Sequence, residues 1–469
     1  MKEQYKRLFN IISITILLIV QTVLFMLFWY GWIVKSNDTA AAGFSDYGNI
    51  AVTLIYMLIM VFFTKTLGGY KVGYMKISDI CMSQFIAIVC CNVIEYLQIS
   101  VLLHSALDAL PILLLTAVEI LIIVPWAYYS RRIYLKMYPP QKMIFVYGER
   151  IQRELYDKIS SRGDNYNIVA SISIKEGIGQ ICNRIKEYEA VILGDIPAQM
   201  RNDIVKYCYS NSIRVYITPK ISDIVIMGAE DITLFDTPLL LIKDYGLSGE
   251  QLFVKRIMDI FISLVLLIIV SPFMLITAIL IKAYDGGPVF YRQERFTRDR
   301  KVFQILKFRS MTTDSQKDGA RITAKNDSRI TPVGRVIRRL HFDEIPQLVN
   351  ILKGDMSFVG PRPEWVVTTE KYEKAVPEFS FRLRVKAGLT GYAQVFGKYN
   401  TTPYDKVKLD LMYIEKYSIW LDIKIILLTF KAIFSKDNSE GVDSNQTTAL
   451  LDDYDKDVKT FGIHSKMQE

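Results

Sequence analysis

The chain has 469 residues, of which 51% are hydrophobic, and its mean hydropathy of +0.21 is high for a soluble protein. Its net charge of +9 suits an anionic membrane face or phosphorylated substrates, and the long apolar runs make nucleic acid the poorest candidate partner. The five cysteines follow no disulfide or zinc-site spacing, and three histidines exclude a histidine-rich metal centre.

Four apolar stretches in the first third of the chain are long enough, or nearly so, to cross a bilayer core of about 30 Å as helices. They cover residues 8–34, 50–66, 80–103 and 107–129. Basic residues flank the bundle and separate its second and third stretches, whereas the other two loops hold Lys35 as their single base. The positive-inside rule therefore places both ends of this bundle, residues 1–135, in the cytoplasm. Glu95 and Glu119 fall within the spans and are either functional or helix-pairing residues.

Residues 141–245 alternate short β-like runs with helical patterns, which predicts a small parallel, Rossmann-like α/β module. The expected strands cover 143–148, 167–174, 190–194 and 213–217, and the expected helices 178–188 and 198–209. The first strand ends at a single Gly148 without the phosphate-cradling G-x-G-x-x-G sequence. We therefore expect a structural or dimerising module rather than a nucleotide-binding one.

A fifth apolar run covers residues 254–283 and is interrupted by Ser271 and Pro272. Basic residues lie on both of its flanks, which favours a re-entrant helix that bends at Pro272 and returns to the cytoplasmic side. The alternative is a proline-kinked spanning helix, which would carry everything after it out of the cell. Residues 404–434 are amphipathic and either pack on headgroups or in a core, and residues 436–469 are expected to form a mobile tail.

The adjacent carboxylates of Asp343 and Glu344 stand among basic residues on both sides. Cations in this pattern can hold a multiply charged phosphate and keep a neighbouring carboxylate ionised. A surface salt-bridge cluster is the alternative interpretation of the same window. The surrounding cations are Arg335, Arg338, Arg339, Lys353 and Arg362.

Several further motifs occur in fixed order around this pair: GGPVFYRQER from Gly286, FQILKFRSM from Phe303, FDEIP from Phe342, KGDMSFVGPRPE from Lys353 and KAGLTGYAQV from Lys386. The ordered series resembles the bacterial polyprenyl-phosphate hexose-1-phosphate transferases, the monotopic phosphoglycosyl transferases that start exopolysaccharide and capsule synthesis. The resemblance is close over residues 250–435. Over the first 245 residues it extends to architecture alone, as in the large members of the family.

The resemblance implies a role for each matching residue. Asp343 would be the nucleophile, and Glu344 would assist it and share with it the binding of Mg²⁺. Ser271 and Pro272 match the family's helix break, and Asp410 matches a carboxylate in a late motif. Lys398 stands where the family has arginine, which keeps the charge but loses bidentate geometry. The cations placed around the substrate phosphates are Lys307, Arg338, Arg362, Lys398 and Arg295.

The fold expected from these observations is that of a membrane protein of the α plus α/β class. It has a four-span bundle, a Rossmann-like module, and a re-entrant helix followed by a small α/β catalytic domain on the membrane face, residues 250–435. The implied reaction moves a sugar-1-phosphate from a UDP-sugar to undecaprenyl phosphate at the cytoplasmic face of the bacterial inner membrane, releasing UMP. We expect a homodimer. The identity of the sugar stays open.

Two other functions are compatible with parts of the chain. A non-catalytic membrane scaffold for a glycan assembly complex would use the α/β module, but it would need none of Asp343, Glu344, Lys307 and Arg362. A membrane-anchored nucleotide-sugar dehydratase would need a bound dinucleotide, and the missing glycine fingerprint argues against it.

Overall fold

The computed structural model describes residues 5–35, 46–104, 108–148, 153–160, 162–163, 165–243, 246–312, 329–397 and 401–433. Lys398 and the expected mobile tail lie outside these residues. The chain divides into two compact units, Met1–Thr218 and Pro219–Glu469, which are described separately.

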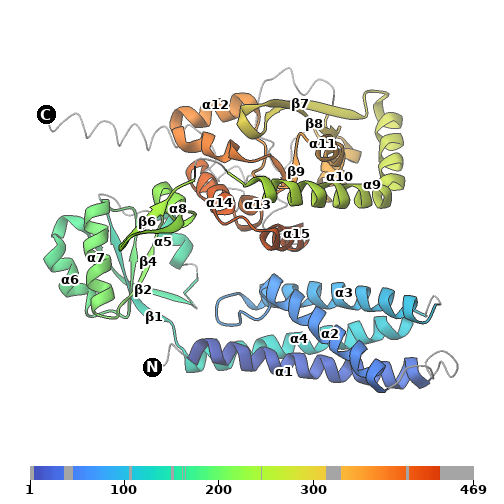
Figure 1. Cartoon of the computed structure of the whole chain (residues 1–469), viewed down its shortest axis with the longest axis horizontal. Coiled ribbons are helices and arrows are strands. Elements are labelled where there is room, and N and C mark those ends of the chain that lie inside the picture. Colours follow the sequence, from blue (N-terminus) through green and yellow to red (C-terminus); the bar gives the residue numbers. More distant parts are fainter. Residues whose placement is uncertain are drawn as a thin grey trace. The chain divides into compact units, whose positions relative to one another are not determined.

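The first unit begins with the four helices that the apolar stretches predict (Figure 1). Together with a later helix they make five that are long and apolar enough to cross a membrane. The prediction of a membrane protein with an amino-terminal helical bundle is therefore confirmed. The four helices are α1 (Tyr5–Phe28), which continues as η1 (Trp29–Val34), α2 (Asp46–Leu67), α3 (Ile77–Leu102) and α4 (Leu110–Met137).

Glu119 joins three helices inside this bundle. Its carboxylate accepts hydrogen bonds from Tyr56 on α2 and from Asn92 on α3, the latter at 2.8 Å. A polar side chain that is fully buried in an apolar bundle is stabilised when such partners satisfy it. Glu119 is thus a helix-pairing residue of the bundle.

A four-stranded parallel sheet follows the bundle, in the strand order β2-β1-β3-β4. The predicted strands and helices are all present, and one further helix, α5, follows β1. A Cβ on Gly148 would lie 2.6 Å from the carbonyl oxygen of Asp195, so this glycine permits a close backbone contact. The elements are β1 (Gln141–Tyr147), α5 (Arg153–Ser160), β2 (Tyr166–Ser173), η3 (Ile174–Glu176), α6 (Ile178–Ile185), β3 (Ala190–Leu193), α7 (Ala198–Ser210) and β4 (Arg214–Ile217).

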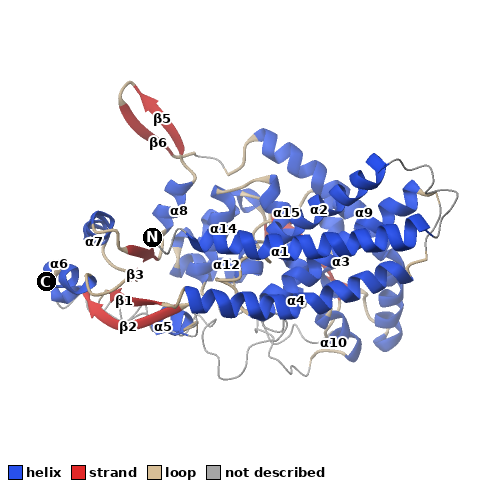
Figure 2. Ribbon diagram, turned by 90° about the horizontal axis from the view of Figure 1, so that it is seen from below, coloured by secondary structure: helices blue, strands red, loops and turns tan. Residues whose placement is uncertain are grey.

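The second unit starts earlier than the motifs indicate. Helix α8 (Ile221–Met227) buries Ile221 and Ile224 in the core of the carboxy-terminal domain, so it belongs to this domain rather than to the α/β module. A hairpin of β5 (Glu230–Leu234) and β6 (Thr237–Leu241) follows and projects from its surroundings (Figure 2). All its strand residues are exposed, four of them large and apolar on one face, which are Ile232, Leu234, Leu239 and Leu241.

The long apolar helix α9 (Gly249–Asp285) runs in two directions in Figure 1 but has no break in its helical structure. Pro272 cannot donate to the carbonyl of Ile268, and the hydroxyl of Ser271 donates to that carbonyl instead, at 2.9 Å. The expected helix break at Ser271 and Pro272 is therefore a bend within a continuous helix. In the most apolar stretch of this helix, 11% of the residues are buried. Most of its apolar side chains are therefore exposed.

The first half of α9 is fastened to the carboxy-terminal domain by buried charges. Lys255 lies 2.6 Å from Asp422, and Asp259 accepts hydrogen bonds from the hydroxyl of Ser357 and the main chain of Phe358. Arg256 donates to the last carbonyls of α11, which completes the end of that helix. These contacts fix the membrane helix to the domain that carries the acidic pair.

The carboxy-terminal domain is a helical layer around two small sheets, antiparallel β7–β8 and parallel β9–β10. Its core includes Leu348, Ile351, Met356, Val359 and Leu411. Its elements are β7 (Phe290–Phe296), η4 (Arg298–Arg300), β8 (Val302–Phe308), α10 (Pro332–Arg339), η6 (Phe342–Glu344), α11 (Gln347–Lys353), β9 (Ser357–Val359), α12 (Val366–Ala375), η7 (Pro377–Arg384), β10 (Gly388–Thr390), α13 (Tyr392–Phe396), α14 (Pro403–Glu415) and α15 (Ile419–Ile433).

Candidate active site

The acidic pair lies on η6, a single turn between α10 and α11. His341 enters this turn with a φ of 55°, and Phe342 stacks against Phe308 of β8, with ring centroids 6.3 Å apart. Phe308 and Phe342 also pack with Met274 and Ile281 of α9. The turn is therefore held between β8 and the second half of the membrane helix.

Lys307 reaches the pair from β8, and Asn350 of α11 fixes that strand. The side-chain amide of Asn350 donates to the carbonyl of Gln304 at 2.8 Å and accepts from the amide of Leu306 at 3.0 Å. Asn350 thus pairs with the main-chain groups of β8 as a neighbouring strand would. These groups belong to the residues just before Lys307.

Arg362 reaches the pair from the loop after β9, where glycines let two backbones approach. A Cβ on Gly360 would lie 2.4 Å from the carbonyl oxygen of Lys386, and one on Gly388 would lie 2.1 Å from the amide of Gly360. Only glycine fits this crossing without displacement of the backbone. The glycines of the two motifs that begin at Lys353 and Lys386 therefore set the course of the loop 361–364.

Glu344 is paired with two cations at once. Its Oε1 lies 2.6 Å from Lys307 Nζ and 2.6 Å from Arg362 Nη2, while Arg362 Nη1 donates to Oε2 at 3.2 Å. Burial opposes ionisation of this carboxyl, but Arg362 and Lys307 outweigh it and hold the pKa of Glu344 well below its ordinary value. The bidentate fork of Arg362 also fixes the orientation of the carboxylate.

Asp343 has different surroundings from its neighbour. Among the described residues none donates a hydrogen bond to its half-buried carboxylate. Burial raises the pKa of Asp343, Lys307 opposes this, and the negative charge of Glu344 adds to the rise. The pair therefore holds one carboxylate that is fixed by two cations beside one to which no described residue donates a hydrogen bond.

The remaining predicted cations are less direct. Arg338, at the end of α10, is close enough to lower the pKa of Asp343 without a hydrogen bond to it. Arg295 of β7 donates to the carbonyl of Pro363 at 3.1 Å and to the side chain of Gln293, so it supports the loop rather than the carboxylates. Burial lowers the pKa of Arg295.

Asp410 lies behind the loop instead of beside the acidic pair. Its Oδ2 is 2.7 Å from Nη2 of Arg382, and both side chains are nearly inaccessible. The two groups form an ion pair, but the geometry at Oδ2 is not that of a hydrogen bond. Sequence reasoning missed Arg382, Glu364 and Lys406; the spacing of Lys406 and Asp410, four residues apart on one helix, was the one available signal.

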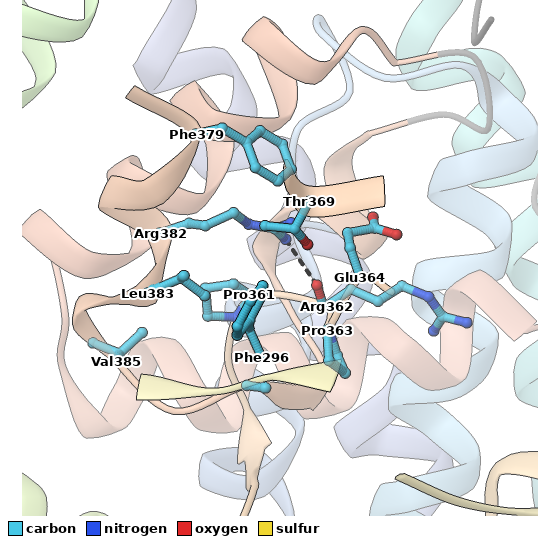
Figure 3. Close-up of a pocket in the computed structure, with 11 residues that line it drawn as sticks. Phe296, Pro361, Arg362, Pro363, Glu364, Thr369, Phe379, Arg382, Leu383 and Val385 are labelled. Carbon is cyan, nitrogen blue, oxygen red and sulfur yellow. Dashed lines mark hydrogen bonds between the residues drawn. The ribbon is translucent and has the colours of Figure 1, made fainter. Parts of the chain in front are cut away.

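A small cleft lies on the side of the loop away from the Arg362 guanidinium (Figure 3). In Figure 3 the side chains of Arg362 and Glu364 point away from Phe379, Leu383 and Val385, and the dashed line joins Arg382 to the Arg362 carbonyl. The cleft is lined mainly by apolar side chains. Asp343, Glu344 and Lys307 do not line it, and Arg362 belongs to it as part of the loop. Its remaining lining residues are Phe296, Pro361, Pro363, Thr369, Arg382 and Ala387.

Two hard oxygen ligands for a divalent cation are present, the carboxylates of Asp343 and Glu344. Among the residues that the structure describes, no group of three or more His, Cys, Asp and Glu side chains is arranged to hold a metal. Mg²⁺ is commonly bound by one or two carboxylates, with substrate phosphates and water completing its shell. The donor set fits Mg²⁺ that arrives with a diphosphate substrate.

Comparison with known proteins places this domain in a family. Residues 250–436 match the family model described as bacterial sugar transferase. A relative from Caulobacter vibrioides, named UDP-glucose:undecaprenyl-phosphate glucose-1-phosphate transferase, is 36% identical over 190 residues, which are 39% of this chain and 71% of that protein. The chain belongs to the bacterial sugar transferases. The acidic pair, its cations and Asp410 all lie within the matched residues.

Two other relatives of this family carry different sugars in their names. A UDP-N-acetylgalactosamine-undecaprenyl-phosphate N-acetylgalactosaminephosphotransferase of Aeromonas hydrophila is 41% identical over 186 residues, 39% of this chain and 44% of that protein. A UDP-glucose:undecaprenyl-phosphate glucose-1-phosphate transferase of Klebsiella pneumoniae is 41% identical over 217 residues, 45% of each. The chain thus matches less than half the length of these two relatives. The resemblance seen in the motifs is confirmed.

Proposed function

We propose that this protein transfers a sugar-1-phosphate from a UDP-sugar to undecaprenyl phosphate, as the first step of exopolysaccharide or capsule synthesis. The observation that carries the proposal is the contrast within the acidic pair, where Glu344 is locked by Lys307 and Arg362 while Asp343 has a carboxylate available for attack. The names of the relatives support the choice of both substrates.

The chain's own residues supply a two-step transfer. A carboxylate oxygen of Asp343 attacks the phosphorus that bears the sugar; an O–P bond forms and the bond to the UMP oxygen breaks. A phosphate oxygen of the lipid then attacks the same phosphorus, giving a lipid diphosphate sugar and restoring the carboxylate. Lys307 and Arg362 offset the negative charge of the diphosphate. Mg²⁺, bound through Asp343, Glu344 and the diphosphate, would supply further charge neutralisation.

A cytoplasmic site on the membrane face is part of the proposal. The basic flanks of α9 and its bend at Pro272 support a helix that enters and leaves the bilayer on one side. This would bring a water-soluble UDP-sugar and a lipid phosphate to the same turn of chain.

We also propose a homodimer, supported by the hairpin β5–β6. An isolated two-stranded hairpin is marginally stable in water, and this one exposes an apolar face. Cross-linking between cysteines substituted for Leu239 in native membranes is expected to give a dimer band, and a monomer alone would contradict the proposal.

The transfer is tested by the release of UMP from a panel of UDP-sugars by the purified chain with undecaprenyl phosphate and Mg²⁺. One sugar is expected to support turnover, and the lipid product is expected to contain it. A non-catalytic scaffold would release no UMP from any member of the panel. UMP release without a lipid-linked product would contradict the proposed acceptor.

A further inference from the structure

Arg362 is held from behind by a buried charge pair that the proposed transfer does not use. Nη2 of Arg382 donates to the main-chain carbonyl of Arg362 at 2.9 Å and lies 2.7 Å from Oδ2 of Asp410. Arg382 is 2% exposed and Asp410 is 1% exposed. Desolvating two charges costs free energy that apolar residues of similar size would avoid. Stability alone is therefore a poor explanation for this pair.

The same helix grips the loop at a second point. Lys406 lies one turn before Asp410 on α14, and its Nζ donates to Oε1 of Glu364 at 2.8 Å. Helix α14 therefore restrains the loop at two points. Asp410 holds Arg382 against the carbonyl of Arg362, and Lys406 holds the carboxylate of Glu364.

The opposite side of Arg362 has much more freedom. Its side chain is 44% exposed, yet it must place two N–H groups on Glu344 at 2.6 and 3.2 Å. A long, exposed side chain loses considerable rotamer freedom when it is held in a single geometry. When its main chain is fixed, less conformational freedom is lost on forming the two hydrogen bonds from Arg362 to Glu344.

We propose that Arg382, held by Asp410, is a positioning residue that fixes the main chain of Arg362 and thereby keeps the Arg362 fork on Glu344. This inference rests on the proposed transfer and gives the late aspartate of the motif series a role in it. Arg382 contacts the Arg362 carbonyl and Asp410 rather than the acidic pair, so it acts through that carbonyl.

The expected consequence is a loss of kcat/KM that follows the position of the Arg362 side chain. Its two N–H groups reach Glu344 at 2.6 and 3.2 Å, and a main chain that is no longer held leaves the guanidinium in that geometry less often. Lysine at position 382 keeps the charge but lacks the planar group that joins the Arg362 carbonyl to the Asp410 carboxylate. A residue that only stabilised the fold would reduce the amount of folded enzyme and leave kcat/KM per folded molecule unchanged.

The test measures kcat and KM of UMP release by the full chain at one pH, with Mg²⁺ and undecaprenyl phosphate present, in Arg382→Lys and Asp410→Asn. Both are expected to lower kcat/KM per folded molecule by about tenfold. In an Arg362→Lys background, Arg382→Lys is expected to cause no further loss, because both changes act on the same contact.

Asp422→Asn is the matched control, because it breaks another buried pair of the same unit, Lys255–Asp422 at 2.6 Å. It is expected to lower the Tm and leave kcat/KM per folded molecule unchanged. If Asp410→Asn does not fold, Lys406→Gln, which loosens the loop at Glu364, is expected to lower kcat/KM in the same way. An unchanged kcat/KM in Arg382→Lys, or a full additional loss in the Arg362→Lys background, would overturn the inference. A wild-type chain without UMP release would instead overturn the proposed function.

Discussion

Asp343 and Glu344 are neighbours in the chain with opposite electrostatic surroundings. Because a carboxylate oxygen of Asp343 is proposed to attack the phosphorus, Asp343→Asn is expected to reduce UMP release by at least about a thousandfold while leaving the fold intact. Asp299→Asn provides a control, since Asp299 is an exposed aspartate of the same unit. Activity within tenfold of wild type in Asp343→Asn, with a circular dichroism spectrum like that of wild type, would remove Asp343 from the role of nucleophile.

Glu364 gives a second prediction, about stability and pH. Burial opposes its ionisation, but Lys406 and Arg382 lower its pKa from 4.5 to about 2. A depressed pKa contributes stability above the unfolded value, about pH 4.5, and this contribution is lost as the pH falls towards 2. The difference corresponds to on the order of 3 kcal/mol.

Glu364→Gln is therefore expected to lower the Tm at pH 7, and the gap from wild type should narrow below about pH 4.5. Thermal unfolding in detergent across this pH range provides the measurement. Glu294→Gln, at an exposed position of β7, is expected to change the Tm little. A gap that stays constant from pH 7 to pH 3 would show that the ion pair is not its source.

The sequence could identify Asp343, Glu344, Lys307 and Arg362 because each lies in a recognisable motif with its chemistry on its side chain. It could not identify Arg382, whose partners are the carbonyl of Arg362 and the carboxylate of Asp410. Those contacts exist because η7 and α14 pack together, which no local pattern specifies. Asp410 was found by its motif, but its position behind the loop required the fold.

At the scale of single elements, periodicity predicts what is regular and fails where tertiary contacts decide. The four spans and the parallel strands follow from runs of apolar residues of the expected length. The α/β module was expected to extend to residue 245, but the second unit begins at Pro219 with α8. Seven residues with apolar Ile221 and Ile224 do not indicate in the sequence which of two cores they enter. The hairpin β5–β6 was missed because β5 is short and begins with two acidic residues, and β6 contains a proline followed by three consecutive leucines.

Helix α9 carries the prediction that belongs to this scale. Because both of its ends are expected to be cytoplasmic, a cysteine at Tyr284 in a cysteine-free chain should be shielded from an impermeant thiol reagent in intact cells. A cysteine at Tyr47, which is 85% exposed at the start of α2 and beyond the first span, should be labelled. Labelling at position 284 would mean that α9 spans the bilayer, and a cytoplasmic active site would then be ruled out.

At the scale of the whole molecule, the division of the chain decides which part can act alone. The motifs begin near residue 250, and taken alone they predict that a chain starting at Gly249 keeps the chemistry. The structure shows that this cut removes three buried residues of the carboxy-terminal core, Ile221, Ile224 and Leu247. Loss of two buried isoleucines alone costs at least about 4 kcal/mol, which is a large part of the stability of an ordinary domain.

A chain that starts at Pro219 is therefore expected to keep the fold and the first half of the reaction, whereas one that starts at Gly249 is expected to have a markedly lower Tm. With its UDP-sugar and Mg²⁺, the longer form should gain the mass of one sugar phosphate at Asp343 and lose it when undecaprenyl phosphate is added. The same form with Asp343→Asn should gain nothing. If the form from Pro219 were well folded and formed no adduct while the full chain did, the first unit would have to contribute groups to the site, and the assignment of the chemistry to residues 250–436 would fail.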